Sequence, residues 1–227
     1  TALEAITTGD NNIAIGYGAM DATTTAYDCI AIGTNALGGQ TTSVSGYKNI
    51  MIGTSAGQTT NAAMNVGIGY EALKINQALF CVAVGDSALK TNAYGTGCVA
   101  VGADALKLNG LGLYTTAVGY SALASFQGVG SPANYNTAVG AYALKVSTVG
   151  NNTAVGYQAG LGVTSGSNNT LIGYNAGTAT SPSGNITTGS NVVCFGDTNV
   201  TAAYVEIDAW TTSDERDKAD QTDFTGG

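Results

Sequence analysis

Residues that enzymes commonly use for catalysis are scarce in this chain. Its 227 residues include no histidine, so the chain cannot form a Ser-His-Asp triad. The segment GTSAG at residues 53–57 matches the G-x-S-x-G nucleophile pattern, but Ser55 lacks the histidine base that this chemistry requires. No C-x-x-C pair and no phosphate-binding G-x-x-x-x-G-K-[ST] loop occurs. We therefore expect no metal ion, no cofactor and no enzymatic activity toward an external substrate.

One pair of side chains, Ser213 and Lys218, could nonetheless do chemistry. The two residues lie five positions apart in the segment SDERDK. Such a pair can form a Ser-Lys dyad, in which a lysine whose pKa is lowered by burial acts as the base for the serine nucleophile. An ordinary charged loop would contain the same residues, and the spacing alone does not separate the two interpretations.

A short repeat runs through most of the chain and must position every other side chain. Its copies resemble NNTAVGYQAG at residues 151–160, and each has a glycine after a short apolar triplet; we call this glycine the anchor. The anchors are Gly16, Gly33, Gly53, Gly69, Gly85, Gly102, Gly119, Gly140, Gly156, Gly173 and Gly196. Successive anchors lie 16 or 17 residues apart, except for three steps of 20, 21 and 23 residues. A fixed short period predicts coils stacked into a solenoid.

The triplet before each anchor predicts a short strand that is apolar on both faces. Its first residue is Ile, Val or Thr, its last is Ile or Val in ten of eleven copies, and the residue between them is mostly small. Strands that are apolar on both faces are normally buried on both. We expect the β-branched face to fill the interior of the coil and the small-residue face to contact another chain. On that hypothesis Ala117→Arg or Ala138→Arg would abolish assembly.

The fold class expected from this pattern is all-β, a parallel β-roll or β-solenoid of about eleven repeats. Ten steps of ~4.8 Å between strands make a rod of roughly 50 Å. The expected organisation is an entry segment at 1–12, the repeat domain at 13–200, a connecting strand at 201–212 and a further domain that begins at 213–227.

Composition excludes some partners. Charged residues make up 10% of the chain and the formal net charge is −8, which argues against a nucleic-acid partner. Seven of the fifteen acidic residues lie from Glu206 onward, so the rod itself is close to neutral. Apolar runs are too short to predict insertion into a membrane. A neutral, polar exterior rich in Thr, Ser and Asn suits an extracellular structure.

Three sets of side chains recur in one phase of the repeat, and each allows two interpretations. Lysines that lie five residues after an anchor favour a solvated edge over a docking strip for an anionic glycan; they are Lys74, Lys90, Lys107 and Lys145. Tyrosines directly after an anchor favour stacking between coils over sugar binding; they are Tyr17, Tyr70, Tyr120, Tyr157 and Tyr174. Cys81 and Cys98, on adjacent coils, favour free buried thiols over a disulfide, because parallel stacking leaves a long Cβ separation.

The three longer steps between anchors contain insertions, at residues 43–48, 124–135 and 178–190. All three fall in the same phase of the repeat, so they should protrude from corresponding positions on the rod. Binding residues are commonly found on loops of a rigid scaffold. The expected receptor-binding residues are Gln127, Ser131, Asn134, Tyr135, Ser183 and Asn185.

The pattern N-x-[TV]-A-[VI]-G-Y-x-A-[LG] resembles the head repeats of trimeric autotransporter adhesins, the YadA-like β-rolls, and still more the repeats of phage and algal-virus fibres. This resemblance covers roughly residues 10–200 and implies a left-handed roll and a homotrimer. The end of the chain, TSDERDKAD followed by DFTGG, is similar to the opening of the endosialidase-type intramolecular chaperone, which helps fibres trimerise and then cuts itself off. That resemblance implies Ser213 as nucleophile and Lys218 as its partner.

Together these features predict a structural and host-attachment module of a viral tail fibre. The expected partners are two further copies of the chain, other tail proteins of the virion and a cell-surface receptor, namely a glycan. The alternative is a bacterial surface adhesin or extracellular filament with the same fold. A polysaccharide-degrading tailspike is less favoured, because no convincing carboxylate pair is present.

We expect the full-length precursor to be cleaved at or beside Ser213. Ser213→Ala or Lys218→Ala should each block this cleavage, because each removes one partner of the dyad. Mass spectrometry of the mature fibre and of the two variants measures the outcome. A wild-type fibre that keeps the chaperone attached beyond Ser213 would show that self-cleavage does not occur.

Overall fold

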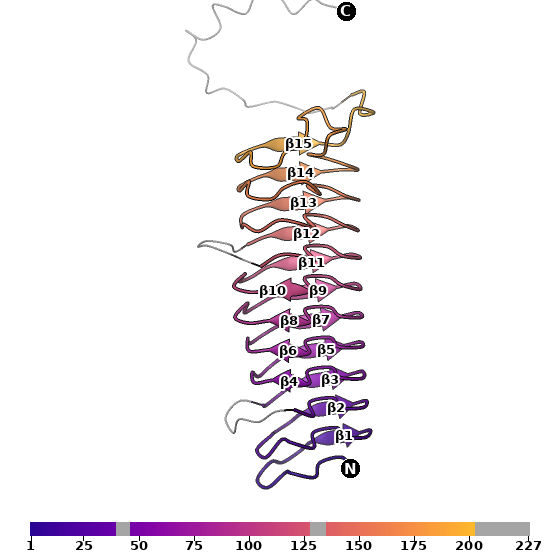
Figure 1. The fold of residues 1–227 in the computed structure, drawn as a ribbon, viewed down its shortest axis with the longest axis vertical. Helices are drawn as coiled ribbons and strands as arrows, with labels where there is room; N and C mark the ends of the chain where they lie inside the picture. Colours follow the sequence, from indigo (N-terminus) through magenta and orange to yellow (C-terminus); the bar gives the residue numbers. More distant parts are fainter. Residues whose placement is uncertain (40–45, 128–134, 203–227) are drawn as a thin grey trace, which may run out of the picture.

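The computed structural model describes residues 1–39, 46–127 and 135–202. In these ranges the chain is an all-β parallel β-solenoid with fifteen strands and no helix. Each coil contributes one strand to an 11-stranded parallel sheet, and four coils contribute another to a 4-stranded parallel sheet. The coils are stacked into a rod with the strands lying across its long axis (Figure 1). The predicted all-β solenoid of about eleven repeats is confirmed.

The strands of the 11-stranded sheet coincide with the apolar triplets before the anchors. They are β1 (Ile13–Ile15), β2 (Ile30–Ile32), β3 (Ile50–Ile52), β5 (Val66–Ile68), β7 (Val82–Val84), β9 (Val99–Val101), β11 (Thr116–Val118), β12 (Thr137–Val139), β13 (Thr153–Val155), β14 (Thr170–Ile172) and β15 (Val193–Phe195). Neighbouring strands pair in register, so that Ala117 lies beside Ala138, which lies beside Ala154. Equivalent residues of the repeat therefore form columns along the rod. We number each column from the anchor, so the triplet occupies positions −3 to −1.

The 4-stranded sheet lies on another part of the coil, six and seven residues after the anchor. Its strands are β4 (Thr59–Thr60), β6 (Ile75–Asn76), β8 (Thr91–Asn92) and β10 (Leu108–Asn109). The second residue of each strand is buried, whereas Thr59, Ile75 and Leu108 are exposed. This sheet therefore has a polar inner column and a mixed outer face.

The column at −2 points into the coil, contrary to the expectation from the sequence. Ala83 and Ala117 are fully buried, whereas the β-branched side chains at −3 and −1 face outward, with Ile15 59% and Val101 36% exposed. The prediction that β-branched side chains fill the interior and small ones contact another chain is wrong. Ala117→Arg or Ala138→Arg would instead place a charge inside the coil and disrupt the coil itself.

The interior is too narrow for β-branched columns because the segment after the anchor fills it. The residues at +3 and +4, such as Ala122 and Leu123, are fully buried. Where the residue at −2 is large, the residue at +4 is glycine, as for Met51 with Gly57. A Cβ on Gly57 would lie 2.8 Å from the Met51 Sδ. The two columns thus share one fixed volume, as expected of a close-packed interior.

The anchor glycine is required by both backbone conformation and space. Gly119 has φ +128°, a value that residues with a Cβ rarely adopt. A Cβ on Gly119 would lie 2.6 Å from the carbonyl carbon of Gly140, the next anchor in the stack. Successive coils therefore touch backbone to backbone at this column, and only glycine allows that approach.

Asparagines at −4 satisfy buried backbone groups between coils. The Asn152 Oδ1 accepts a hydrogen bond from the backbone N–H of Asn169 at 3.0 Å, and the Asn136 Oδ1 accepts one from the N–H of Asn152 at 2.9 Å. The Asn152 Nδ2 donates to the carbonyl of Gly166 at 3.0 Å. Buried polar groups are costly unless they are paired, so this column explains why Asn recurs before the strand.

Gly119→Ala should prevent stable folding, whereas Gly184→Ala should be tolerated. Gly119→Ala adds left-handed strain and a clash with the neighbouring coil, which together cost about 3 kcal/mol or more. Gly184 also has a positive φ, +67°, but nothing lies within 4 Å of its added Cβ. That control should lose only about 1–2 kcal/mol. Thermal unfolding followed by circular dichroism measures both; equal midpoints for the two variants would contradict the proposed role of the anchor.

Candidate functional site

The predicted receptor-binding residues do not form one site. Gln127 and Tyr135 are exposed at the two ends of the insertion between β11 and β12. Ser131 and Asn134 lie outside the described residues. Ser183 and Asn185 are exposed on the insertion between β14 and β15, three coils or ~14 Å further along the rod. The two insertions therefore present separate surfaces.

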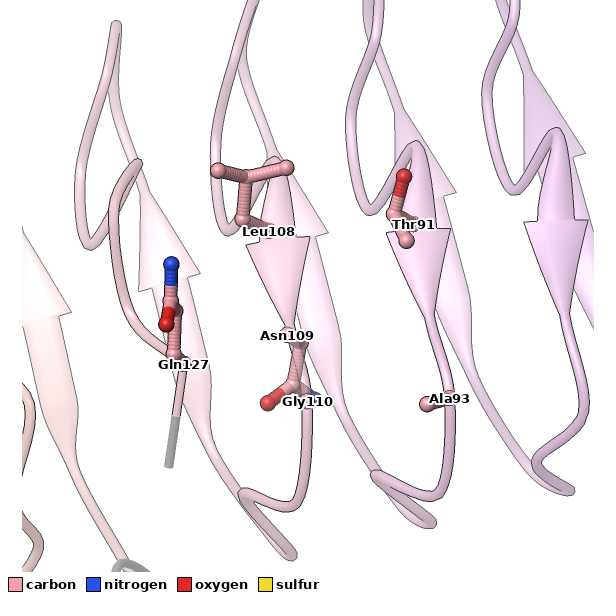
Figure 2. Close-up of a pocket in the computed structure, with 6 residues that line it drawn as sticks. All are labelled: Thr91, Ala93, Leu108, Asn109, Gly110 and Gln127. Atoms are coloured by element: carbon pink, nitrogen blue, oxygen red, sulfur yellow. The ribbon is translucent and has the colours of Figure 1, made fainter. Parts of the chain in front are cut away.

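A cavity of about 270 Å³ borders Gln127 on the outer side of the 4-stranded sheet. Its lining is mostly apolar and consists of Thr91, Ala93, Leu108, Asn109, Gly110 and Gln127. Figure 2 shows Thr91, Leu108 and Gln127 in a row on successive coils. The cavity thus lies where β10 ends the 4-stranded sheet and the insertion at 124–135 begins.

The polar groups of this cavity differ in what they can offer a ligand. The Asn109 side chain is buried and already bonded: its Nδ2 donates to the Gly112 carbonyl at 2.9 Å, and its Oδ1 accepts from the Gly112 N–H at 3.0 Å. The Gln127 side chain is exposed at the rim, and its amide can both donate and accept. The cavity therefore combines the apolar Leu108 surface with an adaptable polar group, as small-molecule sites commonly do.

The insertion at 178–190 is compact and held by its own hydroxyl groups. Ser181 is buried, and its Oγ donates to the Thr178 carbonyl at 3.0 Å and lies 2.8 Å from the Ser183 Oγ. The Ser183 Oγ also donates to the Cys194 Sγ at 3.3 Å. The Ser183 hydroxyl is therefore engaged by Ser181 and by Cys194 of β15, whereas the insertion presents Asn185 to solvent.

Four tyrosines on consecutive coils form a continuous line, which we call the tyrosine strip: Tyr120, Tyr142, Tyr157 and Tyr174. Successive ring centroids lie 5.3, 6.1 and 5.5 Å apart, the first two contacts edge-on and the third stacked. The predicted stacking of tyrosines between coils is confirmed for Tyr157 and Tyr174, whereas Tyr120 contacts Tyr142 edge-on. Tyr17 and Tyr70 make no ring contact with another aromatic side chain in the part of the chain that the structure describes.

Tyr142 reaches the strip from a different position of the repeat. The other three tyrosines lie at +1, but that position holds Ala141 in this coil, and Tyr142 follows at +2 with φ +62°. Lys145 places its Nζ 5.1 Å from the Tyr142 ring centroid, within the range of a cation–π contact. Desolvation raises the pKa of the Tyr142 hydroxyl, and Tyr120 and Tyr157 add to the shift. The phenol is therefore neutral at physiological pH.

The lysine column has acidic partners that its spacing did not indicate. The Glu71 carboxylate is buried and accepts from both Lys74 and Lys90, with each N···O distance 2.5 Å. Lys107 pairs with Asp104 at 2.9 Å. Hydrogen bonds from Lys74 and then Lys90 lower the pKa of Glu71. Lys90 lies one coil beyond Glu71, so this cluster links adjacent coils.

Three cysteines occupy the −4 column, where six other coils have asparagine, and they act as donors there. The thiols of Cys81 and Cys98 donate to the carbonyls of Gly95 and Gly112, each at 3.2 Å. The hydrogen bond with the Cys81 sulfur and burial raise the pKa of the Cys98 thiol. Both cysteines are free and buried, as predicted.

Ser213 and Lys218 lie outside the described residues. Within residues 1–39, 46–127 and 135–202, no group of three or more Cys, Asp or Glu side chains is arranged to hold a metal ion. The same ranges contain no helix with the length and apolarity needed to cross a membrane. Ser55 occupies the +2 column with φ +57°, and its N–H donates to the Thr34 carbonyl at 2.8 Å. The GTSAG match is therefore an ordinary copy of the repeat.

Comparisons with protein-family models, curated proteins and solved structures find no match to this chain. The candidate sites therefore depend on geometry and on the sequence pattern.

Glu71→Gln should destabilise the rod at neutral pH by about 1–2 kcal/mol, because the buried carboxylate pairs with two lysines. A lowered folded-state pKa stabilises the protein above the unfolded-state value of about 4.3, and this contribution is lost as the pH falls through the folded-state pKa. The difference between wild type and variant should therefore disappear at acidic pH. Denaturant titrations across this range measure it, with Asp104→Asn as a control for a single, more exposed pair. A difference that does not depend on pH would contradict an ionic origin.

Proposed function

We propose that the chain is the shaft of a homotrimeric tail fibre that attaches a virus to its host. The observation that carries this proposal is the outer face of the 11-stranded sheet. Columns −3 and −1 contain eighteen Ile, Val or Phe side chains and four Thr. We call these two columns the outer apolar face. It runs along all eleven coils.

Exposure along the outer apolar face favours burial against further copies. Ile68, Val101, Val155 and Ile172 are each 36 to 38% exposed, and Ile15 reaches 59%. Monomeric soluble proteins rarely expose a large continuous apolar surface, and such surfaces mark interaction sites. A second copy offers the same straight columns at the same coil spacing, so it is a partner of matching length. Three copies around one axis would cover each face within a closed assembly.

The proposed interface is the outer apolar face and not the small-residue face that the sequence suggested. Both assignments have the same basis, namely an apolar strand face that a single coil leaves uncovered. The interior of each coil takes the small residues, so the large ones remain for contact between chains. The repeat pattern, which resembles those of adhesin heads and viral fibres, supports the same assembly. It also supports a virion location and contact with other tail proteins.

Attachment to a glycan is supported by the surfaces that the outer apolar face leaves free. The cavity at Gln127 and the insertion at 178–190 lie away from columns −3 and −1 of the repeat. A cavity with an apolar floor and few polar groups suits one sugar unit. Several weak contacts on three chains and several fibres would add up through effective concentration.

A bacterial surface adhesin with the same fold is the second candidate, because the same repeat pattern supports it. Genes for virion proteins beside the coding sequence would favour the fibre, and a membrane anchor would favour the adhesin. A polysaccharide-degrading tailspike remains the third and least supported hypothesis.

Ile68→Lys should dissociate the trimer while the coil stays folded. The side chain lies on the outer apolar face, so the lysine would be solvated in a monomer but buried without a partner in the trimer. Each copy contributes one such charge, and we expect the dissociation constant to rise at least about tenfold. Sedimentation velocity gives the mass, and circular dichroism checks the fold. The matched control is Ile75→Lys on the 4-stranded sheet, at 42% exposure against 37% for Ile68. A wild-type protein that is a folded monomer, or dissociation by Ile75→Lys alone, would contradict the proposed interface.

A further inference from the structure

We infer that the tyrosine strip, together with Lys145, binds an acidic linear polysaccharide laid along the rod. This inference rests on the proposed attachment function and names the surface and the class of glycan. It concerns a surface separate from the cavity at Gln127, because it lies at the turns that follow β11 to β14 rather than on the 4-stranded sheet. These turns form a column beside the strand arrowheads (Figure 1).

Three of the four rings are exposed, Tyr142 is half-buried, and all four are already in position. Tyr120, Tyr157 and Tyr174 are 50, 43 and 57% exposed, which leaves ring surface and hydroxyl groups open to a ligand. Contacts between neighbouring rings fix their orientation, and a tyrosine has only two side-chain torsions to order. Binding therefore costs little conformational entropy.

The chemistry of a tyrosine ring matches that of a sugar ring. A pyranose has a face of C–H groups, which packs on the electron-rich face of an aromatic ring, and a rim of hydroxyl groups, which hydrogen-bond to phenols. The Tyr157 hydroxyl already accepts a hydrogen bond from the Gln158 Nε2 at 3.1 Å, which places an amide beside that ring. The strip thus offers a hydroxyl group on each coil, and ring surface wherever a neighbouring ring or the Lys145 ammonium does not cover it.

The repeat of the strip indicates a polymer. One ring per coil, with centroids 5.3 to 6.1 Å apart, continues over four coils. A compact ligand would cover one or two rings, whereas an extended sugar chain parallel to the rod would contact all four. Tyr142 supports this interpretation, because it restores a ring in the coil where +1 is alanine.

The distribution of charged residues around the strip favours an acidic polymer over a neutral one. Between Asp104 and Asp197 the sequence has no acidic residue, although the whole chain has a net charge of −8. Its two charged residues in this stretch are Lys107 and Lys145, and Lys107 pairs with Asp104. Lys145 forms no salt bridge with any residue that the structure describes. Asp197 occupies +1 in the coil after Tyr174, where it is buried and accepts hydrogen bonds from Asn199. The strip itself therefore contains no acidic side chain and has one cation, Lys145, available to pair with carboxylates.

A single-stranded nucleic acid would also stack on aromatic rings, but it requires a basic groove along its backbone. One unpaired lysine over four coils does not supply that groove. One cation can pair with an occasional carboxylate of a polysaccharide, but it cannot neutralise the phosphate of every nucleotide. The strip therefore favours the polysaccharide.

The test uses electrophoresis of the assembled protein in gels that contain alginate, hyaluronan or polysialic acid, with neutral dextran as the reference. Wild type should be retarded by at least one acidic polymer and not by dextran, and added salt should reduce the retardation. Tyr157→Ala/Tyr174→Ala and Lys145→Gln should each weaken binding about tenfold. Tyr17→Ala, at an exposed tyrosine outside the strip, and Lys48→Gln should leave it unchanged.

Several outcomes would overturn the inference. These are no retardation by any acidic polymer, equal retardation by dextran, or strip variants that bind like wild type. Sedimentation velocity on every variant tests whether the strip is instead a contact between copies of the chain. Loss of the trimer in Tyr157→Ala/Tyr174→Ala would show that it is. A wild-type trimer that adsorbs to cells but ignores the polymers refutes only the strip, whereas a monomeric wild type refutes the proposed function itself.

Discussion

Backbone contact at the anchor glycines is the constraint on which the rest of the rod depends. At this column one coil meets the next with no room for a Cβ, since a Cβ added to Gly119 would lie 2.6 Å from the carbonyl carbon of Gly140. That contact fixes the height of each coil and keeps the strands in register. It also fixes which positions face inward, because the segment after the glycine must turn back under the strand. The Ala and Leu columns at +3 and +4 then occupy the interior.

Much of the fold could be predicted from the sequence, because the same residue types recur at the same positions in eleven repeats. The glycine column, the Asn column and the triplet strands are each recognisable from residue type alone. The inward face of the strand was predicted wrongly, since apolar residues at −3, −2 and −1 do not by themselves say which side is enclosed. A signal was present nevertheless. Both large residues at −2, Met51 and Leu171, have glycine at +4, as expected of columns that share one volume.

The candidate sites were less predictable, because they depend on contacts between positions that differ from coil to coil. Glu71 joins Lys74 and Lys90 from a column whose other members are mostly Ser, Asn or Gly. Tyr142 joins the tyrosine strip from +2, so an alignment of repeat positions misses it. The cavity at Gln127 forms where the 4-stranded sheet ends, and nothing in the spacing of anchors marks that end. Such features become visible only when neighbouring coils are placed in space.

The direction of the hydrogen bonds between coils determines how the rod responds to force. Strands lie across the long axis, so the bonds that join coil to coil run along it (Figure 1). Each coil contacts only its neighbours, as in other solenoids. A pull on the two ends of the chain therefore acts along these bonds and separates coils from one another, whereas compression presses the backbones of successive anchors together. A single rod should therefore resist compression along its axis better than it resists tension.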